Sequence, residues 1–406
     1  MKPKDLKSLT GKNKFNNISG NHRNKIILIP VYLIVFFSFF DTHAQMPVLA
    51  PYTLSLGATP FLLGLVVGFY SLFNIFGNFA GGIVIDNKGW WYPLIIGLAG
   101  VFLALLFYTQ AISAYHLVMI RAGHGFMGGL LVPASLACLT ANKANSTSHD
   151  LRLALFGATI GLAAVTGPLF AGIIANQFGF HTVYYSLALM MAAAAVIASG
   201  FINKNDSRSE SFISSPVSIK LIMTKPYLQG AFIFALGTMG STGTLASFLP
   251  ARAQSLGLDH AQTGMLFAAF ALSAIIIQIS WPKLLKPLIK SNFQGCVMGL
   301  LLIFGTLIYA AVSNTSTGLY IALIIYGTGF GLSFQGMLGL VMDNSDPAWR
   351  GRAIGIFFAT YSFGVALLPP LSGLIWQNIT AIFPFYTSAA VTLLTVIISK
   401  VLCSKQ

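Results

Sequence analysis

Apolar stretches of about the length needed to cross a lipid bilayer constrain this chain more than any other feature. A membrane-spanning helix needs about 20 predominantly apolar residues. Gly and Pro occur inside many of the stretches, but membrane helices tolerate both. The sequence therefore predicts an all-α membrane protein with twelve transmembrane helices. The expected spans are 26–49, 61–85, 92–110, 115–139, 153–175, 183–202, 227–249, 264–281, 294–312, 318–341, 353–375 and 383–402.

The composition excludes a soluble protein. Hydrophobic residues make up 56% of the chain and charged residues 8%, whereas ordinary soluble domains have about 25% charged residues. The three cysteines, Cys138, Cys296 and Cys403, have neither a metal-binding spacing nor the pattern of a disulfide framework. The sequence also lacks a phosphate-binding loop, a nucleophile constellation and a metal cluster. We therefore expect no enzymatic activity, no cofactor and no ATP-driven pumping.

The loop charges predict how the chain is oriented in the membrane. Of the 23 Lys and Arg residues, all except Arg121 and Arg252 fall in the N-terminal tail, the even-numbered loops or the C-terminus. Cytoplasmic loops carry such an excess of positive charge. We expect a multi-pass protein of the plasma membrane with both termini in the cytoplasm. The same pattern explains the formal charge of +14 without a nucleic-acid partner.

An internal repeat with a period near 200 residues predicts two homologous halves of six helices each. Transporters built from two parallel repeats bind their substrate between the halves, near the middle of the membrane. The paired positions are Leu56-Gly57 with Leu256-Gly257, Gly64 with Gly264, Pro168 with Pro369, and Gly172 with Gly373. The expected organisation is a basic tail (1–25), an N-terminal bundle (26–202), a cytoplasmic linker (203–226), a C-terminal bundle (227–402) and a short cytoplasmic end (403–406).

The first span contains an acidic residue, Asp41, followed closely by His43 and Gln45. An ionised carboxylate inside a membrane costs about 2.5–3.5 kcal/mol even on insertion scales, and such residues commonly handle protons or substrates. Two other interpretations are open. Asp41 lies at a helix end among the headgroups, or residues 26–40 are the core of a cleaved signal peptide. Removal of this span would spoil the charge pattern, which favours a retained span with a functional buried acid.

The loop between the second and third spans carries a family motif. The sequence Gly82-Ile-Val-Ile-Asp86-Asn-Lys-Gly89 resembles the G-x-x-x-D-x-x-G signature of the major facilitator superfamily, and the resemblance covers the whole chain after the tail. It implies that Asp86 latches the two halves together on the cytoplasmic side. This chain has Asn87, Trp90 and Trp91 where the family has basic residues. The alternative is that 86–89 is simply a turn.

The fourth span resembles the family's R-x-x-x-G pattern, with Arg121 and Gly125 at the matching positions. The resemblance implies that Arg121 takes part in proton movement. A single arginine near a span end can instead extend its charged group to the membrane surface. His124 lies three residues further along, on the same helix face. A lone histidine in a membrane is more often a packed, hydrogen-bonded residue than a proton carrier.

The fifth span resembles the antiporter motif that ends G-P-x-x-G-G and marks drug–proton exporters. Ala171 replaces one of its glycines, and the first span ends in Pro47-Val-Leu-Ala-Pro51, similar to the P-V-x-P ending of drug exporters. Small residues let helices approach closely, and a proline bends its helix. Glycines of this kind also occur in any packed membrane helix. The motif positions are Gly157, Gly161, Gly167, Pro168 and Gly172.

The family resemblance also implies which spans line the substrate cavity, namely the first, fourth, seventh and tenth. Phe and Met side chains make soft apolar surfaces that accept compounds of varied shape, although most of them must face lipid or pack the bundle. The expected cavity residues are Tyr32, Phe36, Phe40, Phe234, Met239, Tyr326 and Gln335, and the expected proton-coupling residues are Asp41, Arg121, His43 and His124.

We therefore interpret the chain as a secondary transporter that exports small lipophilic compounds in exchange for protons. Alternatives are proton-coupled uptake of a sugar or another nutrient, dedicated export of a siderophore or metabolite, and a receptor or scaffold that transports nothing. Expected partners are a small-molecule substrate, protons and the lipid bilayer, with a monomer as the functional unit. Depth estimates along the first and fourth spans suggest an ion pair between Asp41 and Arg121.

Overall fold

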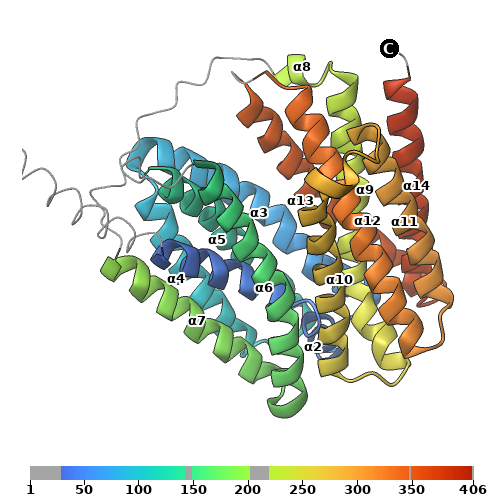
Figure 1. Ribbon diagram of the computed structural model, residues 1–406. Helices are drawn as coiled ribbons and strands as arrows, with labels where there is room; N and C mark the ends of the chain where they lie inside the picture. The colour runs from blue at the N-terminus through green and yellow to red at the C-terminus, as the bar shows by residue number, and fades with distance from the viewer. Residues whose placement is uncertain (1–28, 142–148, 202–218, 347–348, 405–406) are drawn as a thin grey trace, which may run out of the picture.

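The computed structural model describes residues 29–141, 149–201, 219–346 and 349–404. The expected tail (1–25), most of the expected linker and the last two residues lie outside this part of the chain. The described residues form helices joined by short turns, and no strand occurs among them (Figure 1). The prediction of an all-α protein is confirmed.

Among the described residues, eleven helices are long and apolar enough to cross a membrane, and a bent pair of helices before them makes twelve when it is counted as one span. This agrees with the twelve spans expected from the sequence. After the first helix, Ile29–Ala44, the elements are α2 (Leu49–Ser55), α3 (Pro60–Lys88), α4 (Trp91–Tyr108), α5 (Ala114–Ala141), α6 (His149–Phe178), α7 (Phe180–Phe201), α8 (Ile219–Ile222), α9 (Pro226–Ser255), α10 (His260–Ser280), the π-helical turn η2 (Trp281–Leu285), α11 (Asn292–Val312), α12 (Ser316–Asp343), α13 (Arg350–Asn378) and α14 (Phe383–Cys403).

The first span differs from the single helix that the sequence predicted. Its two pieces, Ile29–Ala44 and α2, meet at an angle of 48°. Pro47 lies in the break, and a proline has no amide hydrogen to donate to the preceding turn. The backbone instead forms tight turns, with Met46 N donating to His43 O (3.1 Å) and Val48 N to Gln45 O (3.2 Å). The span therefore ends at Ser55 and not at the predicted residue 49.

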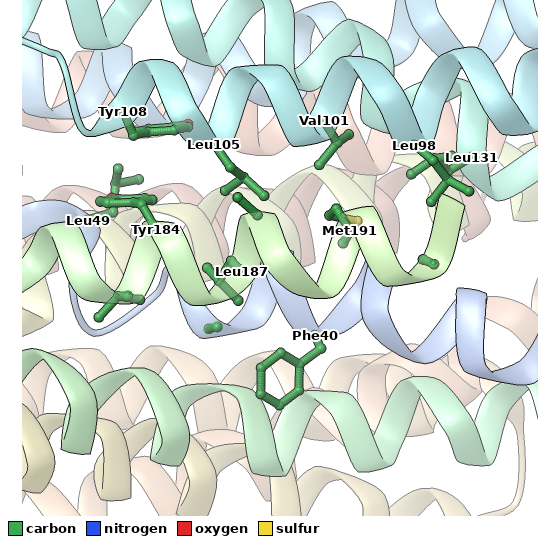
Figure 2. Packing of buried hydrophobic residues seen from close by; sticks show 14 of the residues in the cluster. Phe40, Leu49, Leu98, Val101, Leu105, Tyr108, Leu131, Tyr184, Leu187 and Met191 are labelled. Atoms are coloured by element: carbon green, nitrogen blue, oxygen red, sulfur yellow. The ribbon is translucent and has the colours of Figure 1, made fainter. Parts of the chain in front are cut away.

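The helices form two bundles, the first from the helices up to α7 and the second from α9 to α14. In the first bundle, α4 packs against both α5 and α7. Figure 2 shows the side chains between α4 and α7, where the rings of Tyr108 and Tyr184 are stacked with centroids 4.5 Å apart. Leu105, Leu187 and Met191 continue this buried layer along the two helices.

The two bundles meet mainly at one end, which we call the α2 end because α2 lies there; the opposite end, near α8, is the α8 end. At the α2 end, α3 packs against α13 and α6 packs against α10. The backbones touch at glycines. A Cβ atom at Gly172 would lie 2.5 Å from His260 O, and one at Gly64 or Gly264 would clash with the carbonyl oxygen of Pro369 or Pro168. The structure is therefore closed at the α2 end.

The sequence repeat reappears as a repeat in backbone geometry. Gly57 and Gly257 end their helical segments with φ values of 77° and 80°, which favour glycine because other residues pay a steric cost there. Each is followed by a helix with a side-chain cap. Thr59 accepts a hydrogen bond from Leu62 N, and Asp259 forms a capping box with Gln262. The paired turns place α3 and α10 in equivalent positions of the two bundles.

Candidate functional site

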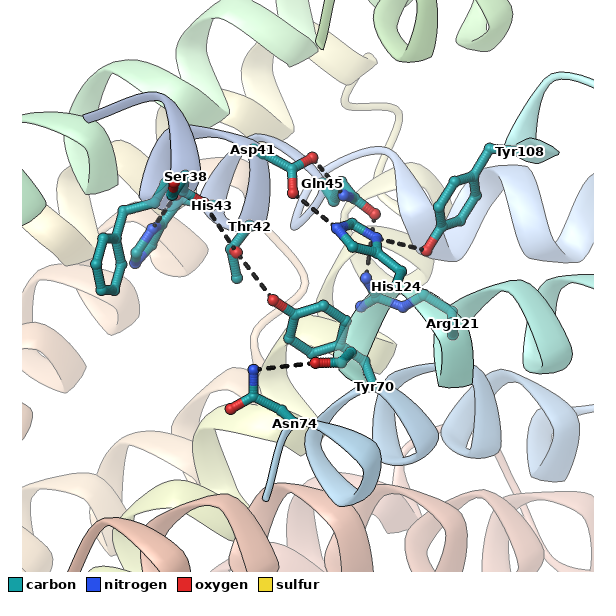
Figure 3. Close-up of polar contacts among 12 residues, drawn as sticks. Ser38, Asp41, Thr42, His43, Gln45, Tyr70, Asn74, Tyr108, Arg121 and His124 are labelled. Atoms are coloured by element: carbon teal, nitrogen blue, oxygen red, sulfur yellow. Dashed lines mark hydrogen bonds and ion pairs between the residues drawn. The ribbon is translucent and has the colours of Figure 1, made fainter. Parts of the chain in front are cut away.

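Asp41 lies inside the first bundle, with 2% of its side chain exposed. Its Oδ2 is 2.9 Å from His124 Nε2 on α5, and its Oδ1 accepts a hydrogen bond of 2.8 Å from Gln45 Nε2 (Figure 3). A buried carboxylate is tolerated when it is paired and hydrogen-bonded. Asp41 is therefore enclosed by the protein within a network of polar side chains and is not exposed at a helix end.

Arg121 also turns inward from α5, and 6% of its side chain is exposed. Its Nη1 donates to Gln45 Oε1 (3.1 Å), its Nε donates to Val66 O (3.1 Å), and its guanidinium lies 4.5 Å from the centre of the Tyr70 ring. The expected direct pair with Asp41 is wrong. Gln45 stands between the two charges and hydrogen-bonds to both, while His124 is the residue paired with the acid.

His124 connects Asp41 to a tyrosine. Its Nδ1 is 3.3 Å from the hydroxyl of Tyr108, at the C-terminal end of α4. When His124 is neutral with its proton on Nε2, it donates to Asp41 and accepts from Tyr108. When a second proton arrives at Nδ1, His124 donates in both directions. Both the neutral and the doubly protonated ring are thus compatible with these two contacts.

A cavity of about 280 Å³ opens beside this network, between the two bundles. The side contributed by the first bundle holds the charged residues of the lining, Asp41, His43 and Arg121, together with apolar residues such as Leu49 and Val67. The side contributed by the second bundle carries no Asp, Glu, His, Lys or Arg among the described residues. It consists of Met239, Thr242, Gly243 and Ala246 on α9, and Tyr361 and Val365 on α13.

Most of the residues expected to line the cavity lie elsewhere in this conformation. Met239 lines it, whereas Phe40 and Phe234 are buried in the cores of their bundles. The ring centroids of Phe36 and Phe40 are 5.3 Å apart. The Tyr32 hydroxyl lies 3.3 Å from the backbone oxygen of Arg152. The expected lining by the tenth span is also wrong, because α13, the eleventh, faces the cavity. On α12, Tyr326 hydrogen-bonds to Ser241 and Thr242 behind the lining, and Gln335 is partly buried outside it.

His43 lines the cavity but takes no part in the Asp41 network through a hydrogen bond. Its Nδ1 lies 2.7 Å from Phe39 O, one helical turn back, and a carbonyl oxygen can only accept. Nδ1 therefore carries a proton, and in the neutral ring Nε2 is the acceptor. The adjacent Thr42 hydroxyl lies 3.2 Å from the Tyr70 hydroxyl, and this contact joins the first helix to α3 at the cavity wall.

The residues of the gate motif lie at the α8 end of α3. Asp86 is exposed, and no hydrogen bond or ion pair joins its side chain to another described residue. Gly82 has no neighbour within 4 Å of an added Cβ atom, and Gly89 ends the helix with a φ of 86°. Within the part of the chain that the structure describes, Asp86 therefore makes no latch contact, and the structure is closed at the opposite end.

The antiporter motif runs along α6, and three of its glycines are contact positions. A Cβ atom at Gly167 would lie 3.0 Å from Phe40 O on the first helix, and one at Gly172 would meet α10. Gly161 faces Ile275 of α10, whereas Gly157 has nothing within 4 Å. Pro168 lies inside α6, with its carbonyl beside Gly264. The motif thus joins the helix that carries Asp41 to the seam between the bundles.

Sequence reasoning missed three side chains of the network. Gln45 is four residues after Asp41, and residues at this spacing face each other on a helix, so the sequence held a signal for it. Tyr70 and Tyr108 lie in apolar spans with no such signal. Among the described residues, no group of three or more His, Cys, Asp or Glu side chains is placed to hold a metal ion.

Two bundles of membrane-spanning helices, with a cavity between them that contains charged side chains, define a membrane transporter of the two-repeat class. Solved structures agree with this fold. The crystal structure of the nucleoside transporter NupG superposes with a TM-score of 0.78 at 14% identity, covering 93% of this chain and 98% of that one. An inward-facing bacterial homologue of the human lysosomal transporter Spinster gives a TM-score of 0.74 at 13% identity, covering 94% and 96%.

The sequence profile described as Major Facilitator Superfamily matches residues 31–369. This chain belongs to that family and is a multi-pass membrane transporter. An uncharacterized MFS-type transporter of Methanocaldococcus jannaschii is 21% identical over 341 residues, covering 82% of this chain and 87% of the relative. The inner membrane transport protein YajR of Escherichia coli is 24% identical and covers 82% and 73%. The quinolone resistance protein NorA of Staphylococcus aureus is 31% identical over 160 residues, 39% of this chain and 40% of NorA.

Proposed function

We propose that this transporter exports small lipophilic compounds, including cations, in exchange for protons. The observation that carries the proposal is the buried Asp41–His124 pair at the wall of the central cavity. A carboxylate kept inside a membrane bundle at a cost of about 2.5–3.5 kcal/mol is a candidate proton carrier. The antiporter motif of α6 and the partial similarity to NorA support the direction of transport.

The asymmetry of the cavity supports an amphipathic substrate. The acidic and basic side chains of the lining, Asp41, His43 and Arg121, come from the first bundle, and the facing wall of α9 and α13 carries no described Asp, Glu, His, Lys or Arg. A lipophilic cation would place its charge toward Asp41 and its apolar body against Met239 and Val365. The only described phenylalanine of the lining is Phe39, so Val, Leu, Ala, Met and Tyr provide most of the apolar surface.

Exchange follows if proton and substrate compete for the same carboxylate. In the state closed at the α2 end, which we assign to the outside from the loop charges, Asp41 loses its proton toward the cytoplasm and binds the substrate. After the bundles reopen at the α2 end, a proton from outside neutralises Asp41 and releases the substrate outward. Binding energies of two ligands that share a site are coupled by the same amount in both directions.

Vesicles that contain the purified protein test this function. We expect a permanently charged lipophilic fluorescent cation to accumulate in vesicles whose interior is more acidic than the outside, with the membrane potential clamped. In an antiporter, protons that leave the acidic vesicle drive the substrate into it. This holds for both orientations of the protein in the vesicle membrane. Vesicles without protein provide the control, because a permanent charge prevents passive trapping by protonation. Accumulation only with an alkaline interior would instead establish uptake by symport, and no movement of any compound in a lipophilic panel would refute the substrate class.

Asp86, which is exposed and has no hydrogen-bond or ion-pair partner among the described residues, gives a further prediction. If it latches the bundles only when the α8 end is closed, Asp86→Asn should favour the present conformation. We expect faster labelling of Val132→Cys, in the cavity wall, by an impermeant thiol reagent applied from the α8 side. The three native cysteines would be replaced by serine beforehand. Asp343→Asn, the same chemical change at the same end of the second bundle, is the control. Equal labelling of the two variants would contradict a latch at Asp86.

A further inference from the structure

A short amphipathic segment connects α10 to α11 at the α8 end of the second bundle. It contains the π-helical turn η2, two prolines and three lysines, and its Leu284 and Leu288 are 65% and 78% exposed. Trp281 anchors it, since an added Cβ atom at Gly295 of α11 would lie 2.5 Å from the indole ring. Exposed leucines beside lysines are typical of segments that lie in the headgroup layer of a membrane.

A pocket of about 600 Å³ lies between this segment and the ends of α9, α11, α12 and α14. Lys286 and Lys290 enter it from the segment and Lys400 from α14. No hydrogen bond or ion pair joins these three side chains to another described residue. The only acid of the lining, Asp343, accepts a hydrogen bond of 2.6 Å from Asn292. The pocket therefore has an excess of positive charge.

The rest of the pocket favours a ligand that is both anionic and apolar. Its lining includes the apolar side chains of Ile289, Phe293 and Leu340, and the first turn of α11 adds the positive end of a helix dipole. On α14, Ile397 and Leu394 precede Lys400 by three and six residues, and about half of each side chain is exposed. An exposed apolar path thus leads from the lysines toward the middle of the membrane.

We propose that this pocket binds the phosphate headgroup of an anionic glycerophospholipid from the leaflet at the α8 end. Lys286, Lys290 and Lys400 contact the phosphate, and the acyl chains lie along the exposed face of α14. Basic pockets between transmembrane helices bind anionic headgroups in this way. A free phosphate or phosphorylated metabolite would satisfy the lysines equally but would leave the apolar path without a partner. The inference does not depend on the transported substrate.

Native mass spectrometry of the delipidated full chain tests the site, with phosphatidylglycerol and phosphatidylcholine of identical acyl chains as probes. We expect tighter binding of phosphatidylglycerol. Each lysine near an anionic surface contributes about 1 kcal/mol, so Lys286→Gln together with Lys290→Gln should weaken that binding about 30-fold. The matched pair Lys88→Gln and Lys283→Gln removes the same charge from exposed lysines outside the pocket and should leave the preference intact.

Two further measurements complete the test. One controls for misfolding, and the other distinguishes a phospholipid from a soluble phosphate as the ligand. The double variant Lys286→Arg with Lys290→Arg keeps the positive charge. It should still prefer phosphatidylglycerol if the double Gln variant loses that preference only because its charge is gone. Soluble glycerol 3-phosphate should compete poorly with the lipid. Equal binding of both phospholipids, equal losses in the pocket and control pairs, or tight binding of glycerol 3-phosphate would each overturn the proposal.

Discussion

Asp41→Asn is expected to abolish proton-driven transport and to preserve binding of an uncharged lipophilic substrate. The amide has the size of the carboxylate and can still hydrogen-bond to Gln45 and His124, which contact Asp41 now at 2.8 and 2.9 Å. It cannot exchange a proton, so the gradient no longer biases the equilibrium between the two conformations. Transport driven by an acidic vesicle interior should fall to the level of vesicles without protein.

Asp343→Asn is the matched control for this prediction, because it makes the same change at an exposed position outside the cavity. Downhill exchange of labelled for unlabelled substrate should survive in the Asp41 variant, which separates lost coupling from lost folding.

Arg121→Ala should also impair transport, since Gln45 would lose the group that holds its amide in place. Gradient-driven accumulation by Asp41→Asn at the wild-type level would show that another residue carries the proton.

Gly172→Val is expected to open the seam at the α2 end. Its Cβ atom would lie 2.5 Å from His260 O and 3.2 Å from the Cα of Gly264, so α6 and α10 must separate. Overpacking of this kind typically costs about 1–3 kcal/mol, and about 1.4 kcal/mol changes a two-state ratio tenfold. Spin labels at Gln177→Cys and Ser255→Cys, introduced after replacement of the native cysteines, should report longer distances across the α2 end.

Gly157→Val provides the control within the same helix, because nothing lies within 4 Å of a Cβ atom there and its φ is ordinary. Both substitutions cost the same helix propensity, so a difference between them reports the helix contact. The Gly172 variant should also transport more slowly, since it disfavours one of the two states of the cycle. Label distances that match those of the Gly157 variant would contradict a seam held closed by this glycine.

The repeat and the motifs predicted which glycines lie at helix contacts more successfully than they predicted which side chains hydrogen-bond to one another. Gly64, Gly172 and Gly264 were singled out by the repeat, and Gly172 also by the antiporter motif; all three meet backbone across the seam between the bundles. The direct pairing of Asp41 with Arg121, inferred from depth along two straight helices, is wrong. Depth gives a height within the membrane, but the direction of a side chain depends on helix rotation and on the neighbours it meets. The side-chain amide of Gln45 lies beside Asp41, where the guanidinium of Arg121 was expected.

The sequence by itself determined that the chain is a membrane protein of twelve spans, because the length and apolarity of each stretch suffice to commit it to the bilayer. It also determined the two-fold repeat and the burial of an acid in the first span. Only the tertiary structure decided that His124 pairs with Asp41, that α13 and not α12 lines the cavity, and that the first span is broken near Pro47. These features depend on how helices rotate and lean against one another, and side-chain packing between helices sets that geometry.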